Sequence, residues 1–188
     1  PTTYGAKIHI SELDYVIETA YPLYDSPVLE TGRIEGEIGK HIAGLIDDGS
    51  TLQLGIGGIP NAVLDALKHH KDIGIHSELI GNGVSELMQA GVITNRRKSI
   101  EAGKTICTFA MGNGKLFSFL DRNPAVEFKN VSYTNDPSVI ARNSKFVAIN
   151  SALEVDVTGQ ICAESIGTAL FTGTGGQLDF ALGASIAP

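Results

Sequence analysis

Short β-prone runs and segments of helical period alternate along the middle of the chain, with glycine-rich turns between them. This alternation limits the fold, because strands separated by helices pair in parallel and are covered by those helices. In chain order we predict a strand at 51–56, a helix at 59–67, a strand at 73–76, a helix at 84–90, a strand at 105–110 and a helix at 116–120. The sequence thus predicts an α/β domain of the Rossmann-like kind, with an open, mostly parallel sheet and helices on both faces.

The amino-terminal part of the chain contains two different kinds of segment. Apolar residues recur at helical spacing over 34–46, ahead of the stop signal Asp47-Asp48-Gly49, which predicts another helix. Residues 1–30 hold scattered prolines and no sustained period. We therefore expect an arm or linker over 1–30 and one domain over 31–188.

The carboxyl-terminal third is predicted to contain a hairpin. Asp136-Pro137 can begin a helix, because proline is tolerated in a first helical turn. Residues 146–157 have the composition of a strand, and Thr158-Gly159 is a turn signal. Residues 160–163 are expected to pair back on that strand at one end of the sheet.

Composition excludes several functions. The 188 residues are 43% hydrophobic and 19% charged, as in a soluble globular domain, and the formal net charge of −7 argues against nucleic-acid binding. Arg96-Arg97-Lys98 is interpreted as a solvated loop or as a contact for nucleotide phosphates. Cys107 and Cys162 indicate small core residues in a reducing compartment, so a cytoplasmic location is expected. No stretch predicts a signal peptide or a membrane span.

The sequence GIGGIP, residues 55–60, lies between a predicted strand and a predicted helix. Glycines there allow a ligand to approach the backbone, and amides at a helix amino terminus attract anions. A dinucleotide-binding fingerprint needs a third glycine where Pro60 stands. Glu78 nevertheless follows Gly55 by 23 residues, close to the place of a ribose-binding acid. Nucleotide binding and catalysis both remain open on this evidence.

The segment HSEL places Glu78 at the carboxyl end of the strand predicted at 73–76. Ligands of open parallel sheets bind beyond those ends, so an acid there is well placed for function, although most acids are simply solvated. His76 is interpreted as a residue packed beside the strand, because a lone histidine needs partners to act. Glu86, on the following helix, is expected to be solvated.

Two later segments carry polar residues or glycines in apolar surroundings. Asn150, Asp156 and Gln160 interrupt a strand-like run, and buried polar side chains need hydrogen-bond partners. The loop GTGG, residues 173–176, could direct amides at a developing oxyanion or could form only a tight turn. The residues alone leave both readings of each segment open.

Together the motifs resemble those of the acetyl-CoA hydrolase/transferase family in order and spacing. The likeness is greatest to its 4-hydroxybutyrate CoA-transferases and butyryl-CoA:acetate CoA-transferases, and it runs from about residue 34 to the end. The motifs that carry it are GIGGIPNAV at 55–63, HSEL at 76–79, YTNDP at 133–137, INSALEVDVTGQICAES at 149–165 and GTGGQLDF at 173–180.

The resemblance implies a role for individual residues. It identifies Glu78 as the carboxylate that forms an acyl anhydride and then a thioester with CoA, Asn135 as a polar residue that holds the reacting groups, and Gly176 as an oxyanion amide. Leu153 and Gly176 match CoA-contacting positions, whereas Glu154 does not match the nucleophile. The remaining positions implied to contact CoA are Gly55, Ile56, Gly57, Gly58 and Ile59.

The same resemblance implies a CoA-transferase-like domain whose substrates are acyl-CoA and a carboxylic acid. Coenzyme A would be a substrate, and neither a metal nor a redox cofactor is expected. Members of the family are longer, so we expect this chain to be truncated and to lack a preceding domain; a homo-oligomer is left open. Acyl-CoA hydrolysis and a non-catalytic nucleotide-binding domain are the alternative functions, and no nucleic acid or membrane is an expected partner.

Overall fold

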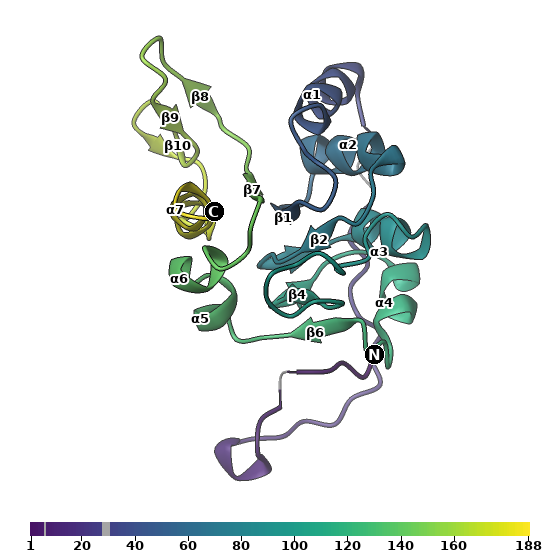
Figure 1. Cartoon of the computed structure of the whole chain (residues 1–188). Helices are drawn as coiled ribbons and strands as arrows, with labels where there is room; N and C mark the ends of the chain where they lie inside the picture. The colour runs from purple at the N-terminus through teal and green to yellow at the C-terminus, as the bar shows by residue number, and fades with distance from the viewer. Residues whose placement is uncertain (6, 28–30) are drawn as a thin grey trace.

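The computed structural model describes residues 1–5, 7–27 and 31–188, and its centre is a parallel sheet (Figure 1). β1 lies between β2 and β7 and pairs with both in parallel. β4 and β6 form a second parallel pair, which a bridge between His76 and Ile106 joins to the β2 side. β3 and β5 continue the array as a third parallel pair. The strands of this array are β1 (Thr51–Leu54), β2 (Gly74–Ile75), β3 (Leu79–Ile80), β4 (Thr105–Cys107), β5 (Phe109–Ala110), β6 (Val126–Phe128) and β7 (Phe146–Ile149).

Helices follow the strands as the alternating pattern predicts. The described α-helices are α1 (Arg33–Ala43), α2 (Gly58–Ala66), α3 (Asn82–Gln89), α4 (Gly114–Leu120), α5 (Val131–Thr134), α6 (Pro137–Ile140) and α7 (Gln177–Ser185), and the 3₁₀ turns are η1 (Ile10–Glu12) and η2 (Leu67–His69). Asp136 caps α6 by accepting a hydrogen bond from the Ser138 amide at 2.8 Å. β6, α5 and α7 are additions to the predicted elements.

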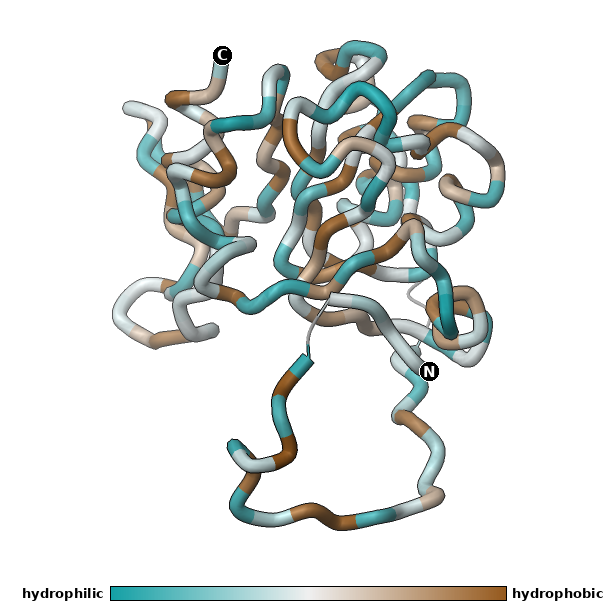
Figure 2. The backbone as a smooth tube through the Cα atoms, turned by 60° about the horizontal axis from the view of Figure 1, so that its bottom comes forward, coloured by the Kyte–Doolittle hydropathy of each residue, from teal (hydrophilic) through white to brown (hydrophobic). Residues whose placement is uncertain are grey.

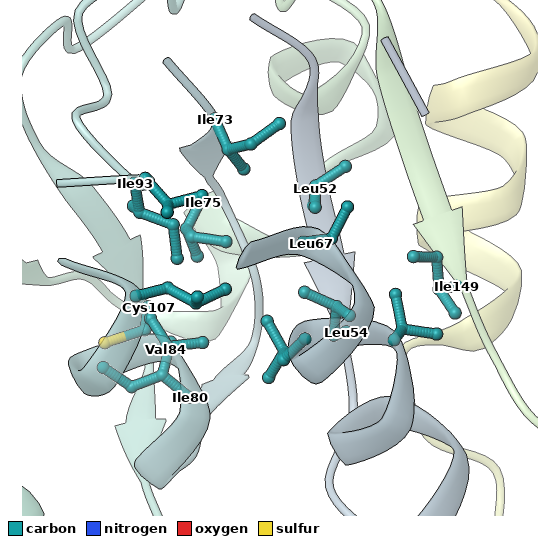
Figure 3. Packing of buried hydrophobic residues seen from close by; sticks show 14 of the residues in the cluster. Leu52, Leu54, Leu67, Ile73, Ile75, Ile80, Val84, Ile93, Cys107 and Ile149 are labelled. Carbon is teal, nitrogen blue, oxygen red and sulfur yellow. The ribbon is translucent and has the colours of Figure 1, made fainter. Parts of the chain in front are cut away.

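The main core fills the space between the sheet and the helices α2, α3 and α4. Figure 3 shows Leu52 and Leu54 of β1 packed with Leu67, and Ile75 of β2 near Val84 of α3. Because a strand directs successive side chains to opposite faces, the odd and even residues of β7 divide between two cores. Its odd-numbered apolar residues join this main core.

A second core covers the opposite face of β7. Phe146 packs there with Ile140 of α6 and Phe180 of α7, and the Phe146 and Phe180 rings are stacked with their centroids 6.3 Å apart. Gly183 of α7 lies so close to Ile140 that an added Cβ would meet its side chain at 2.5 Å. The prediction of helices on both faces of a parallel sheet is confirmed.

Residues 150–172 form two hairpins, and the single strand predicted over 146–157 is wrong. β7 ends at Ile149, opposite Leu54 at the end of its partner β1. The next residue, Asn150, exchanges two side-chain hydrogen bonds with Gln53, of 3.3 and 3.1 Å. The predicted hairpin is present, but it lies outside the parallel array. Its strands are β8 (Glu154–Val155) and β9 (Ile161–Cys162), followed by β10 (Ser165–Ile166) with β11 (Ala169–Leu170).

The amino-terminal segment is attached to the domain near both of its ends, and the Thr2 carbonyl accepts a hydrogen bond from the Arg122 amide at 2.7 Å. Tyr4 forms a parallel bridge with Glu127 of β6, and the Ser26 amide donates to the Gly112 carbonyl at 2.9 Å. Between these points the segment extends away from the domain (Figure 2). The boundary predicted between residues 30 and 31 falls at the edge of 28–30, outside the described residues. No helix within the described ranges is long and apolar enough to cross a membrane.

Candidate active site

The backbone of Glu78 is held from two sides. The Ser77 hydroxyl donates to the Leu54 carbonyl at 2.9 Å and accepts from the Leu54 amide at 3.3 Å, which ties the segment to the end of β1. On the other side the Glu78 carbonyl accepts hydrogen bonds from the amides of Thr108 and Phe109 at 2.8 and 3.1 Å. Glu78 is half-buried. These contacts fix the origin of its side chain before any ligand is bound.

Asn135 reaches the Glu78 carboxylate from the corner between α5 and α6. Its Nδ2 donates to Oε2 of Glu78 at 2.7 Å. The corner is set locally, because Asn130 caps α5 by accepting from the Ser132 amide at 3.0 Å and a separate cap begins α6. Oδ1 of Asn135 is buried without a partner among the described residues, so it remains available to a donor.

Gly176 closes the same site from the amino terminus of α7. An added Cβ at this position would meet Nδ2 of Asn135 at 2.6 Å, would lie closer still to Oε2 of Glu78, and would meet Cε2 of Phe180 at 3.2 Å. Only glycine leaves room for the carboxylate there. Because α7 begins at Gln177, the positive end of its dipole lies beside that carboxylate. The three residues predicted to be catalytic are therefore brought together.

The GIGGIP turn connects β1 to α2 beside open space. Gly57 has a φ of +125°, a conformation that side chains rarely adopt, and a Cβ at either Gly55 or Gly57 would meet no atom within 4 Å. A cavity of about 950 Å³ extends from this turn along α3 and α4. Its lining includes Ile56, Gly57, Gly81, Asn82, Met111 and Gly112, but not Glu78. The cavity and the carboxylate thus flank the glycine turn without coinciding.

The other predicted CoA-contacting residue lies in the exposed hairpins. Leu153 is 39% exposed, and its amide donates to the Cys162 carbonyl at 2.9 Å. Within the described ranges no hydrogen bond joins Leu153 to Glu78, Asn135 or Gly176. Glu154, which the resemblance separates from the nucleophile, is likewise exposed on β8.

The residues of the basic run Arg96-Arg97-Lys98 lie in different environments. The interpretation of the run as a solvated loop is wrong for Lys98. Lys98 is buried, and its Nζ donates to the carbonyls of Ile75 and Lys104 at 3.0 and 2.8 Å. Burial lowers the pKa of Lys98 to about 8. Arg96 is exposed and pairs with Asp72 at 3.1 Å. The cation at position 98 is therefore engaged inside the protein.

The two cysteines lie in different surroundings. Cys107 lies in the main core, as predicted, and burial raises the pKa of its thiol to about 12. Cys162 lies at the hairpins and is half-buried. In the parts of the chain that the structure describes, no group of three or more His, Cys, Asp or Glu side chains could hold a metal ion.

Sequence reasoning did not assign His76, Thr108 and Thr134 to the site. The Thr108 and Thr134 hydroxyls hydrogen-bond each other beneath it. His76 is fully buried, and its Nε2 lies 2.9 Å from the Thr134 carbonyl. A signal for His76 was present, because a residue two positions before Glu78 shares its side of an extended strand. The threonines offered no comparable signal.

The comparisons with known proteins concern the family and the fold of the chain. Residues 112–188 match the family described as the acetyl-CoA hydrolase/transferase C-terminal domain. The chain is 49% identical over 187 residues to 4-hydroxybutyrate coenzyme A transferase of Clostridium kluyveri, a match that covers 99% of this chain and 44% of that relative. The chain belongs to the acetyl-CoA hydrolase/transferase family. It spans less than half the length of the curated relatives that it matches.

Solved structures are similar over the whole fold. RipA from Yersinia pestis superposes with a TM-score of 0.91 at 39% identity, covering 100% of this chain and 43% of that one. A 4-hydroxybutyrate CoA-transferase from Porphyromonas gingivalis gives a TM-score of 0.86 at 40% identity, covering 98% and 44%. The α/β fold class predicted from the sequence is confirmed.

Proposed function

We propose that this chain is the catalytic part of an acyl-CoA:carboxylate CoA-transferase. Its substrates would be short-chain acids such as 4-hydroxybutyrate or butyrate, with acetate as the partner acid. The observation that carries the proposal is the carboxylate of Glu78, held by Asn135 at 2.7 Å beside the amino terminus of α7. A carboxylate is a weak nucleophile toward a thioester, so positioning and charge stabilisation must supply most of the rate.

The proposed reaction has two matched halves. An oxygen of Glu78 attacks the thioester carbon of acyl-CoA, the C–S bond breaks, and a mixed anhydride and CoA thiolate form. The thiolate attacks the glutamyl carbonyl of the anhydride, which releases the first carboxylate and leaves a glutamyl-CoA thioester. The second carboxylate attacks that thioester, and the released thiolate then attacks the acyl carbonyl of the new anhydride. Glu78 is regenerated with no net change in protons or electrons.

The surrounding residues supply the support that this chemistry needs. Asn135 holds one oxygen of Glu78, leaving the other for attack, and the amide of Gly176 would donate to the oxyanion that forms. The turn from Gly55 to Ile59 would contact CoA, and its two glycines that face open space leave room for the ligand. Leu153 would contact CoA from the hairpins.

We further propose that the chain works beneath a preceding domain, which would complete the acyl pocket. CoA would enter as a substrate, without a metal or a redox cofactor. Acyl-CoA hydrolysis would use the same glutamyl intermediates with water as the acceptor. A nucleotide-binding role would instead use GIGGIP and Glu78 for phosphate and ribose.

One assay separates these functions. The complete polypeptide is mixed with butyryl-CoA, with and without acetate, and acetyl-CoA and free CoA are followed by chromatography. Transfer predicts acetyl-CoA that appears only with acetate, whereas hydrolysis predicts free CoA at the same rate in both mixtures. If neither product forms and calorimetric titration detects NAD binding but no CoA binding, the nucleotide-binding alternative replaces the proposal.

A further inference from the structure

The His76 ring lies between the elements that build the candidate active site. It is fully buried, with its centroid 6.3 Å from Tyr133 of α5, 6.2 Å from Phe146 of β7 and 6.5 Å from Phe180 of α7. The last of these rings also borders Gly176, since an added Cβ there would meet Cε2 of Phe180 at 3.2 Å. One side chain thus packs against both segments that converge on Glu78.

The polar contact of His76 leads to Asn135 through a single peptide bond. Nε2 lies 2.9 Å from the carbonyl oxygen of Thr134, and that carbonyl belongs to the peptide that links Thr134 to Asn135. A carbonyl only accepts, so Nε2 must carry the proton and donate. No other hydrogen bond to this carbonyl is present among the described residues. The other side of this peptide is held by the Asn135 amide, which donates to the Val131 carbonyl at 2.9 Å. The His76 ring therefore adds the restraint on the carbonyl side of the peptide from which the Asn135 side chain starts.

A second connection returns from Thr134 to the nucleophile. The Thr134 hydroxyl hydrogen-bonds the Thr108 hydroxyl, and the Thr108 amide donates to the Glu78 carbonyl at 2.8 Å. His76 is itself two residues before Glu78 in the same segment. The side-chain bond from Asn135 to Glu78 is therefore one link in a closed ring of short contacts through Thr108 and Thr134. The bond from His76 to the Thr134 carbonyl is a further connection between the same two segments.

Packing alone does not account for a histidine at this position. Nδ1 of His76 is buried without a partner among the described residues, which is costly for a polar atom. An apolar side chain of similar size would fill the volume and avoid that cost. It would, however, leave the Thr134 carbonyl without a donor, and the peptide before Asn135 would keep only the bond from its amide to the Val131 carbonyl.

We propose that His76 is a positioning residue that holds Asn135 against Glu78 through the Thr134 carbonyl. The inference rests on the proposed function, because the aligned carboxylate is the one that would attack the thioester. The matched test compares His76→Gln, whose side-chain nitrogen can occupy the place of Nε2 and donate, with His76→Phe, which keeps an aromatic ring but has no donor.

The kinetic experiment uses the complete polypeptide and measures kcat and KM for butyryl-CoA with acetate. We expect His76→Phe to lower kcat by roughly tenfold or more while KM changes less than about threefold, because chemistry and not binding is affected. His76→Gln should restore kcat to within about threefold of the starting protein. Unchanged kcat in His76→Phe, or equal losses in both variants, would overturn the proposal.

A second measurement depends neither on activity nor on the folding of His76→Phe. The chain is labelled with ¹⁵N-histidine, and NMR identifies which ring nitrogen of His76 carries the proton at neutral pH, with His76→Gln used to assign the signal. We expect a neutral ring protonated at Nε2. A proton on Nδ1 would overturn the positioning role even if His76→Phe proved too unstable to assay.

The proposed function can be tested independently of the role of His76. Exchange that persists in Glu78→Gln would exclude the glutamyl mechanism whatever His76 does. Loss of exchange in Glu78→Gln together with normal kcat in His76→Phe would leave the proposed function standing and remove only the role given to His76.

Discussion

Two regions contain residues to which the family resemblance gives a function: the segments around Glu78 and the hairpins of residues 150–172. The two regions differ in the contacts that hold them in place. At Glu78 the contacts come from Asn135, 57 residues away, and from Gly176 near the end of the chain. In the hairpins, beyond the pair of Asn150 with Gln53, the side-chain bonds are local, as where Asp156 accepts from the Thr158 and Gln160 amides. Long-range contacts fix a catalytic geometry, whereas local turns define only the shape of a loop.

Burial separates the two regions as clearly as their bonding does. His76 and Thr134 have no exposed surface, but Val155, Val157 and Ile161 on the hairpins are at least 62% exposed. Burial of apolar surface is the main source of stability, so these hairpin residues add little of it. We expect changes around Glu78 to alter activity and stability together, and changes in the hairpins to remain local.

The largest effect should follow from removing the carboxylate that we propose as the nucleophile. Glu78→Gln keeps the size of the side chain but cannot form the anhydride, so we expect exchange of CoA to fall by roughly four orders of magnitude or more. Glu154→Gln, which removes an exposed acid of the hairpins, is the matched control and should exchange at close to the normal rate. Steady-state assays of the complete polypeptide measure both. Comparable losses in the two variants would contradict the contrast between the regions.

A smaller effect concerns stability in acid. Burial lowers the pKa of His76 from 6.5 to about 4, so between these values the unfolded chain binds a proton that the folded chain does not. The contribution of His76 to the free energy of unfolding is therefore full above pH 6.5 and decreases as the pH falls toward 4, by about 3 kcal/mol in total. The free energy of unfolding, measured with urea across this pH range, should fall by that amount more in the starting protein than in His76→Gln. Parallel curves for the two proteins would contradict it.

A matched pair of glycine substitutions should give a comparable or smaller change. Gly176→Ala forces its methyl group against Glu78 and Asn135, so we expect kcat to fall by roughly thirtyfold. Gly175→Ala adds the same methyl group one residue earlier, where no atom lies within 4 Å, and kcat should stay within about threefold. Melting curves establish that both variants fold. Equal activity in the pair would show that close contact at Gly176 does not matter.

The smallest effect should come from the hairpins. Asp156→Ala removes the acceptor of the Thr158 and Gln160 amides, so these amides should exchange hydrogen faster by roughly tenfold. The melting temperature should change by no more than about 2 °C, because little buried surface depends on this turn. Hydrogen-exchange mass spectrometry and calorimetry measure the two quantities. A large drop in melting temperature would contradict this expectation, because it would show that the hairpins unfold together with the core.

The alternation from Thr51 to Leu120 could be predicted because its helices have an apolar period and turn residues separate most of its elements, although the two-residue β3 was missed. α7 had no such signal, because its apolar residues do not form one stripe: Leu178 and Leu182 are exposed, whereas Phe180 and Gly183 are buried. β6 has three residues, too few for an alternating pattern. The strand expected over 146–157 ends at Ile149, where its partner β1 ends at Leu54, and composition cannot reveal the length of a partner strand.

The residues of the candidate site could be proposed from the sequence, but their geometry could not. The end of a parallel strand pointed to Glu78, and the family resemblance added Asn135 and Gly176. Their separation along the chain meant that only the fold could bring them within contact. His76 was expected to pack beside the strand, and it is buried, whereas the burial of Lys98 was not expected. The bonds of both side chains to backbone carbonyls were missed, because sequence alone does not say which polar side chains meet a carbonyl inside the protein.

The most direct measurement of the central claim is mass spectrometry of the complete polypeptide after mixing with butyryl-CoA and no acceptor acid. The account predicts a covalent CoA adduct that hydroxylamine removes and that peptide mapping assigns to Glu78. An adduct on another residue, or a protein of unchanged mass that still exchanges CoA, would contradict it.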